Sequence, residues 1–396
     1  MHASASRKAL GGFFISGLLM SFPGAILPAW GYHLRSDFST TGYFFLGMNL
    51  GVLASLWIAL ILLPRRGTNF VLSIACALAA GAMGYLALFS PPAPDWTRIL
   101  GFFIIGIAAG LLNTAVFHAI STIYQINSAA TINLAGTFFG VGCLTTSLFI
   151  AFTFNAYTVA SRLILFAVIP AIFSIAFARA RVAIDAPIRH RPWQQVARDF
   201  RNPLAILFSL LLFFQFGNEW SIAGWLPLFL IHRIGVSPVT ALVLLSVFWL
   251  ALLLGRIVCQ AILPSVGHGK LLMTNVVTAM LGCITLVLTN NEFGATMGIL
   301  LVGFGFSIIY PLVVEKIGAR FPNYHPGYFN GIFSFALTGG MLAPWLLGYL
   351  ADWSGVEIVM ALPMAGTCAV FMLLVAIMVE SKLSGRGSLQ PEDHRI

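Results

Sequence analysis

This sequence has few charged residues. Of its 396 residues, 21 are Lys or Arg and 12 are Asp or Glu, so 8% are charged whereas 59% are apolar. A soluble protein of this length covers its surface with charged side chains, and so few of them cannot do so. Soluble enzymes and soluble binding modules are therefore excluded. The net charge of +9 does not indicate nucleic-acid binding, because the basic residues lie in short segments between apolar runs.

Other missing features exclude further classes of protein. The five cysteines all lie within apolar runs and form no CxxC pair, so neither a disulfide framework nor a metal site is predicted. The sequence has no GxxxxGK[ST] loop, so ATP is not the expected energy source. It also has no carboxylate pair, histidine cluster or nucleophile–base set at catalytic spacing. We therefore expect no enzyme activity and no cofactor.

Long apolar runs are what the sequence has in abundance. Its mean hydropathy is +0.94, and the runs are long enough to cross about 30 Å of hydrocarbon as helices. The first run follows Arg7 and Lys8, as a signal peptide would, but it is too long for one and has no cleavage site. The predicted fold is an all-α membrane protein with twelve transmembrane helices. They are expected at 9–33, 40–63, 69–89, 97–122, 129–152, 157–178, 203–231, 238–263, 270–290, 293–318, 327–351 and 355–379.

The basic residues fall on one side of these spans. With the N-terminus in the cytoplasm, 16 of the 21 Lys and Arg lie in cytoplasmic segments. The remaining five are Arg35, Arg98, Arg162 and Arg233 outside, and Arg256 within a span. The positive-inside rule then predicts a multi-pass protein of the cell inner (plasma) membrane with both termini cytoplasmic. The connection 179–202 holds six arginines and is predicted to be a cytoplasmic loop that rests on the anionic inner leaflet.

An internal repeat with a period near 200 residues divides the chain into two homologous halves. The motif Leu63-Pro64-x-x-Gly67 recurs as Leu263-Pro264-x-x-Gly267, each time between the second and third spans of its half. Further matches follow in the same order along the chain. Pro28 and His33 match Pro227 and His232, 199 residues later. Gly106, Asn133, Phe138 and Gly142 match Gly303, Asn330, Phe335 and Gly339, in that order and 197 residues later. The predicted units are an N-terminal six-helix bundle (1–178), the basic loop (179–202), a C-terminal six-helix bundle (203–379) and a cytoplasmic tail (380–396).

This architecture resembles the major facilitator superfamily, whose members bind a solute between two bundles that rock about it. Within span seven, residues 217–225 (GNEWSIAGW) are similar to the Gly-x-Glu-x-x-x-x-Gly-Trp element of the fucose, glucose and galactose:proton symporter family. Residues 133–142 and 303–311 resemble the same family. The resemblance implies a secondary transporter of a small solute, a sugar, with proton symport. Gly24 and Asn113 stand where that family has carboxylates. Pro64 replaces the acidic residue of the loop motif that is typical of the superfamily as a whole.

Three charged residues lie well within the predicted spans, where each costs about 2.5–3.5 kcal/mol on insertion scales. Glu219, near the middle of span seven, is a candidate proton carrier or acceptor for substrate hydroxyls; alternatively, it holds helices together in its protonated form. Arg256 and Glu315 lie at matched depth and are predicted to form a gating ion pair. His118, at the position equivalent to Glu315, is the second proton-coupling candidate, because histidine changes charge near neutral pH. It is alternatively a packing residue.

Polar and aromatic residues in the spans supply the substrate-binding candidates, with packing as the alternative role for the aromatic ones. They are Asn113, Gln215, Asn218, Trp220, Trp225 and Tyr310. The expected partners are a small-molecule substrate, a proton and the lipid bilayer, and the protein is expected to be a monomer.

A proton-coupled efflux pump for amphipathic compounds is the rival function, supported by 34 phenylalanines. A facilitative uniporter is another alternative. A cavity lined by Phe and Met would favour efflux, whereas three or more convergent amide or hydroxyl groups would favour a sugar.

Overall fold

The computed structural model describes residues 9–35, 37–126, 128–180, 200–321 and 331–383. Within these residues it contains twelve helical segments long and apolar enough to cross a membrane and no β-strand, which confirms the predicted fold class. The helices are α2 (Gly11–Ala29), α3 (Phe38–Arg66), α4 (Thr68–Leu88), α5 (Asp95–Ile126), α6 (Ser128–Thr153), α7 (Val159–Arg179), α9 (Pro203–Phe229), α10 (Pro238–Val266), α11 (His268–Leu288), α12 (Glu292–Phe306), α13 (Ile309–Arg320), α14 (Gly331–Ser354) and α15 (Ala361–Leu383).

The tenth span is the one that differs from its prediction. It is broken into α12 and α13, with Ser307 and Ile308 between the two helices. Pro311 explains the break, because proline has no N–H to donate to the carbonyl four residues earlier, which belongs to Ser307. The free carbonyl of Ser307 faces the neighbouring helix α10, where it accepts a hydrogen bond from a side chain described below.

Polar side chains at the helix starts explain where several spans begin. Asn202 and Ser237 accept hydrogen bonds from backbone N–H groups in the first turns of α9 and α10. Each is followed by a proline, whose fixed φ suits the first helical position. Asn291 caps α12 in the same way. The polar breaks in the hydropathy pattern are therefore the points at which helices start.

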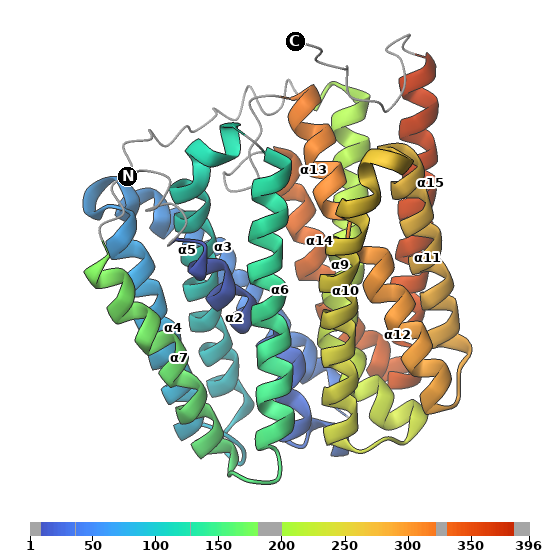
Figure 1. Ribbon diagram of the computed structural model, residues 1–396. Helices are drawn as coiled ribbons and strands as arrows, with labels where there is room; N and C mark the ends of the chain where they lie inside the picture. The colour runs from blue at the N-terminus through green and yellow to red at the C-terminus, as the bar shows by residue number, and fades with distance from the viewer. Residues whose placement is uncertain (1–8, 36, 127, 181–199, 322–330, 384–396) are drawn as a thin grey trace.

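The helices pack as two groups that follow the two halves of the sequence (Figure 1). In the first half α3 packs on α5, α4 on α7 and α2 on α6; in the second half α9 packs on α14 and α15, and α12 on α10 and α11. The most extensive packing between the halves is made by three pairs: α3 with α14, α6 with α10, and α2 with α9. The predicted linker lies almost entirely outside the described residues, so the unit boundaries stay a prediction.

The repeated Leu-Pro-x-x-Gly motif forms the same turn in both halves. Gly67 ends α3 with φ +78° and Gly267 ends α10 with φ +81°. The amide nitrogen of each glycine donates to the carbonyl of the leucine four residues earlier, Leu63 or Leu263, at 3.0 Å. A positive φ strains any residue with a Cβ, so glycine is required at both turns. The sequence repeat is thus also a structural repeat.

Charge distinguishes the two ends of the bundle. The end at which α3, α7 and α13 finish carries mostly basic residues, and we call it the basic end; its described basic residues are Arg65, Arg66, Arg179, Arg201, Lys270, Lys316, Arg320 and Lys382, and its described acids are Glu315 and Glu380. The opposite end carries both signs, namely Asp37, Asp95, Glu292, Asp352 and Glu357 with Arg35, Arg98, Arg162 and Arg233. This asymmetry agrees with the distribution that the positive-inside rule uses.

One carboxylate joins the two halves at the opposite end. Asp352, in the last turn of α14, accepts hydrogen bonds from the backbone nitrogens of Phe38 (2.5 Å) and Ser39 (2.8 Å), at the start of α3. A negative charge at a helix N-terminus is also favourable for the helix dipole. Near this contact, the hydroxyls of Tyr43 and Tyr349 share a hydrogen bond between the same two helices. We call these contacts the Asp352 latch, and they hold the halves together at this end.

The latch predicts a conformational phenotype for Asp352→Ala. Loss of a helix cap costs about 1 kcal/mol, which should raise the population open at the opposite end about fivefold. Labelling of a Phe45→Cys reporter, a position that is 6% exposed, by an impermeant maleimide applied at that end measures the change.

Asp37→Ala is the matched control. Asp37 caps the same helix through Thr40, but from within its own half. Hydrogen bonds from the Ser39 and Thr40 side chains hold the pKa of Asp37 below its usual range, so it too is ionised near neutral pH. Equal labelling in the two variants would mean that Asp352 is only a helix cap.

Candidate functional site

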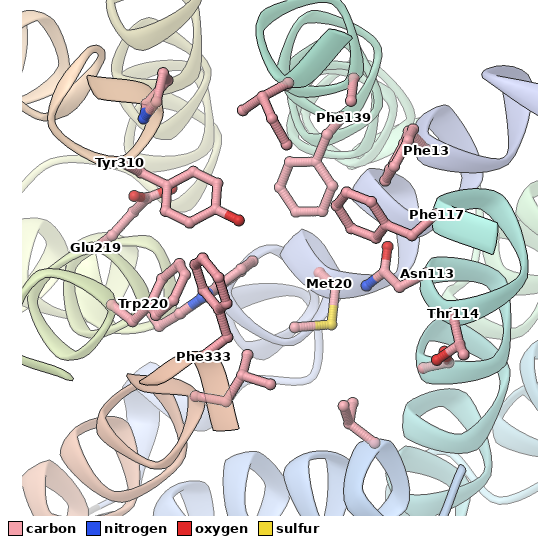
Figure 2. Close-up of a pocket in the computed structure, with 18 of the residues that line it drawn as sticks. Phe13, Met20, Asn113, Thr114, Phe117, Phe139, Glu219, Trp220, Tyr310 and Phe333 are labelled. Atoms are coloured by element: carbon pink, nitrogen blue, oxygen red, sulfur yellow. The ribbon is translucent and has the colours of Figure 1, made fainter. Parts of the chain in front are cut away.

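A cavity of about 210 Å³ lies between the two halves, at the middle of the bundle. Both halves line it, as Figure 2 shows. Its aromatic and thioether side chains are Phe13, Met20, Phe117, Phe139, Phe216, Trp220 and Phe333, and its polar side chains are Asn113, Thr114, Glu219, Arg256, Tyr310 and Ser334. The cavity thus combines an apolar surface with a few polar groups, the usual composition of a small-molecule site.

The cavity lies on the basic-end side of the Asp352 latch. Close to the latch, α3 and α14 are in contact, and a Cβ on Gly42 would lie 3.3 Å from the Cα of Gly348. Further along the same two helices, Leu56 and Leu337 line the cavity instead. The two helices are therefore packed together at the opposite end and separated by the cavity towards the basic end.

Equivalent positions of the repeat face each other across this cavity. Met20 corresponds to Glu219 at an offset of 199, and Asn113 corresponds to Tyr310 at an offset of 197. The helix pair α3 and α10, offset by 200, places Leu56 opposite Arg256. All six side chains line the cavity. The charged residues come from the second half alone, because their counterparts in the first half are apolar.

Glu219 enters the cavity from α9. It is 6% exposed, and its carboxyl interacts electrostatically with Arg256. Figure 2 shows it beside Tyr310, whose hydroxyl points into the space between the walls. Among the described residues that line the cavity, Glu219 is the single acid. A carboxyl in this position can bind a proton or accept hydrogen bonds from a solute.

Asn113 faces Glu219 from the other wall, on α5. The hydroxyl of Ser16 donates to its side-chain oxygen at 2.8 Å, which fixes the amide orientation. Its side-chain nitrogen makes no hydrogen bond to any described residue, and in Figure 2 it points into the cavity. Asn113 therefore presents donor hydrogens to the cavity.

Arg256 is fixed by the break in the tenth span. Its Nε donates to the carbonyl of Ser307 at 3.1 Å, the group that Pro311 leaves without a helical partner. The guanidinium extends towards the first half, where its Cζ lies 3.0 Å from the place of a Cβ on Gly136. A larger residue at position 136 would displace the arginine.

The predicted gating ion pair between Arg256 and Glu315 is not formed. The carboxylate of Glu315 instead pairs with His268 Nε2, the first residue of α11, at 3.1 Å. The equivalent residue of the first half makes the equivalent contact: His118 lies 3.1 Å from Thr68, the first residue of α4. Both side chains pack within their own halves. Matched depth along two helices was a wrong guide, because depth does not define the direction in which a side chain points.

Other candidates lie away from the cavity. Asn218 donates to the Thr367 hydroxyl at 3.3 Å, inside the second half. Trp225 is fully buried and donates to the carbonyl of Pro344 at 2.9 Å. Neither lines the cavity, and Gln215 and His118 do not either. The structure brings together Asn113, Glu219, Trp220, Arg256 and Tyr310. Residue type alone did not indicate the lining residues Phe13, Met20, Thr114, Phe117 and Ser334; the repeat offsets would have indicated Met20.

Two six-helix halves around a central cavity, with a broken helix at its wall, define a membrane transporter. The Major Facilitator Superfamily matches residues 9–344 of the sequence. The chain belongs to this superfamily, and its members are transporters rather than enzymes.

Individual relatives are distant. An uncharacterized MFS-type transporter of Yersinia pestis is 22% identical over 370 residues, 92% of each chain. A sialic acid transporter of Escherichia coli is 27% identical over 46% of this chain and 47% of its own length. A glucose/galactose transporter of Brucella abortus is 27% identical over 40% of this chain and 38% of its own.

Solved structures show the same fold. The E. coli fucose:proton symporter has a TM-score of 0.64 at 14% identity, with 95% of this chain and 99% of that chain covered. A nucleoside transporter has a TM-score of 0.69 at 13% identity and the same coverage. The resemblance of span seven to the fucose-type family is thus accompanied by a fucose-symporter-like fold.

Proposed function

We propose that the protein carries a sugar or sugar-like solute across the cell inner membrane by alternating access, with proton symport. The observation that carries this proposal is the polar lining of the central cavity. Four amide or hydroxyl side chains line it, Asn113, Thr114, Tyr310 and Ser334, which meets the criterion of three or more that favours a sugar over an amphipathic compound. Trp220 adds an aromatic face on which a sugar ring can stack. The sugar-transporting names of two relatives support the same solute class.

Glu219 is the proposed proton-coupling residue. It lies at the cavity wall with no second carboxylate among the described lining residues. Its protonation removes a charge from the interface between the halves, which lowers the cost of closing them around the solute. His118 lies outside the cavity, so a role in coupling would have to be indirect.

Efflux of amphipathic compounds is the second candidate function. Five phenylalanines and Met20 line the same cavity, and flexible apolar side chains accommodate varied ligands. A thermal-shift screen of the purified protein separates the two functions, because a ligand of the native state raises its apparent stability. Stabilisation by monosaccharides supports the sugar proposal, and stabilisation by amphipathic drugs alone contradicts it.

A matched pair of asparagine variants tests the cavity itself. Asn113→Ala should weaken binding of the stabilising solute about tenfold, the usual effect of one lost hydrogen bond to a bound ligand. Asn218→Ala is the same substitution outside the cavity, and it removes a hydrogen bond to Thr367 inside the second half. It should lower protein stability yet leave the affinity unchanged in isothermal titration. Equal loss of affinity in both variants would argue against this cavity as the binding site.

The orientation in the membrane is part of the proposal. We infer that the basic end, both termini and the 179–202 loop face the cytoplasm, from the charge asymmetry of the two ends. An impermeant maleimide applied outside intact cells should label Trp96→Cys, which replaces a side chain that is 65% exposed at the opposite end. It should fail to label His190→Cys until the cells are opened. The reverse pattern would invert the orientation.

A further inference from the structure

One residue that lines the cavity, Arg256, is a buried cation with hydrogen-bond donors that no described residue uses. Arg256 is 5% exposed, and burying a charge at this depth is costly unless it has a partner or a function. Its Nε is bound to Ser307, which fixes the plane of the guanidinium. The two terminal nitrogens make no hydrogen bond or ion pair with any described residue. They remain available to a ligand.

On the α6 side, the described residues around these nitrogens leave space and offer no polar side chain. The guanidinium faces Gly136 of α6, where the absence of a side chain makes room for it. Its neighbours on that wall, Ile132, Ala135 and Phe139, are apolar. A planar guanidinium with two free, parallel donors matches the two oxygens of a carboxylate. A hydroxyl group of a neutral sugar would use only one of them.

The break in the tenth span adds an independent preference for negative charge. Helix α13 begins at Ile309, and the next residues, Tyr310 and Pro311, line the cavity. The first N–H groups of a helix have no helical partners and carry the positive end of its dipole. Transporters with interrupted helices direct such N-termini at anionic substrate groups. The break therefore places a second positive element beside Arg256.

Glu219 balances this charge when the cavity is empty. It interacts electrostatically with Arg256, but the two do not form an ion pair among the described residues. Tyr310 on α13 and Cys143 on α6 are the other titratable groups near the two charges. Once Glu219 binds a proton, the lining carries one uncompensated positive charge, because the equivalent positions in the first half are Met20 and Leu56.

We propose that the transported solute is a carboxylate, a sugar acid, whose carboxyl group binds the terminal nitrogens of Arg256 and enters together with the proton on Glu219. This inference rests on the proposed function, transport of a sugar-like solute, and specifies its chemical class. The bound carboxylate replaces ionised Glu219 as the counter-charge of Arg256. One negative charge thus stays in the cavity throughout, and the halves never close around a lone cation.

Pairs of solutes that differ in a carboxylate test the inference. The probes are glucuronate with glucose, galacturonate with galactose, and N-acetylneuraminate with N-acetylmannosamine, each measured by thermal shift and by binding. In at least one pair the acid should bind the wild type about 10- to 100-fold more tightly than the neutral sugar, the usual effect of a charge-assisted hydrogen-bonded pair. Arg256→Gln should abolish that preference, whereas Arg256→Lys should keep part of it.

Each outcome has a definite meaning. Equal or tighter binding of the neutral sugars overturns the inference and leaves the sugar proposal intact. An acid preference that persists in Arg256→Gln also overturns it. Binding of amphipathic drugs alone contradicts both proposals. If Arg256→Gln fails to fold because Ser307 loses its donor, the wild-type comparison and Arg256→Lys still decide, since an acid bound no better than its neutral partner refutes the inference without any variant.

Discussion

Replacing Gly24 with leucine is expected to abolish transport in a protein that still folds. Gly24 of α2 lies against the backbone of α9, with 3.0 Å between the place of its Cβ and the Cα of Gly224. It also contacts the carbonyl oxygen of Ala223. The two helices belong to different halves, so a side chain here can be accommodated only by separating them. Overpacking of this kind costs about 1–3 kcal/mol, enough to change the ratio of closed to open forms by about 5- to 150-fold.

Gly84→Leu is the matched control. Gly84 lies on α4 with no atom within 4 Å of its Cβ position, so the same change there should leave transport intact. Labelling of the Phe45→Cys reporter from the opposite end should increase in Gly24→Leu and stay low in Gly84→Leu. Size-exclusion chromatography would show that both variants are folded. Normal transport by Gly24→Leu would mean that this end does not need to close as tightly as the structure shows.

Hydropathy was sufficient to predict the twelve spans, but it did not predict the break in the tenth span. All twelve spans were predicted, because a membrane helix needs a continuous apolar run and leaves a simple signal. The interruption at Ser307 was missed, since residues 299–309 are as apolar as any intact span. Pro311 was the available signal: a proline frees the carbonyl four residues earlier. What the sequence did not show was that Arg256 would bind that carbonyl.

The lining of the cavity was predicted in part, for a reason that Glu219 and Asn218 illustrate. These neighbours have similar depth and polarity, yet one lines the cavity and the other packs against Thr367. A hydropathy pattern gives depth, whereas the direction of a side chain depends on how its helix is rotated in the bundle. The sequence repeat gives information about the direction of a side chain, because equivalent positions face the same way. Asn113 and Tyr310, at equivalent positions, both line the cavity. Leu19, the first-half equivalent of Asn218, is buried and, like Asn218, does not line it.

Glu219→Gln is expected to eliminate solute accumulation driven by a pH gradient while solute exchange continues. Glutamine imitates the protonated carboxyl, so the loaded protein can still reorient between its two forms. It cannot release a proton, so the gradient no longer drives net uptake. With one proton per solute, the wild type should reach about tenfold accumulation for each pH unit across the membrane. The variant should reach a ratio of about one.

Proteoliposomes separate the two activities, with net uptake under a pH gradient for coupling and counterflow at equal pH for exchange. Glu315→Gln is the control, because Glu315 is bound to His268 outside the cavity and should keep both activities. The solute is the one selected by the thermal-shift screen. Loss of both activities in Glu219→Gln would show that the carboxylate is needed for binding or folding rather than for coupling.

Two other results would change the mechanism. Continued accumulation by Glu219→Gln would make Glu219 structural, and coupling would then have to involve His118, the remaining candidate in the first half. A wild type without any response to the pH gradient would be a uniporter, and Glu219 would serve only as the counter-charge of Arg256. The charge balance in the cavity argues against that role alone. An anionic solute that displaced ionised Glu219 from Arg256 without a proton would leave two negative charges beside one positive charge, in a site that the halves must close away from water. Protonation of Glu219 removes that excess, which is why binding of the solute and binding of the proton are expected to occur together.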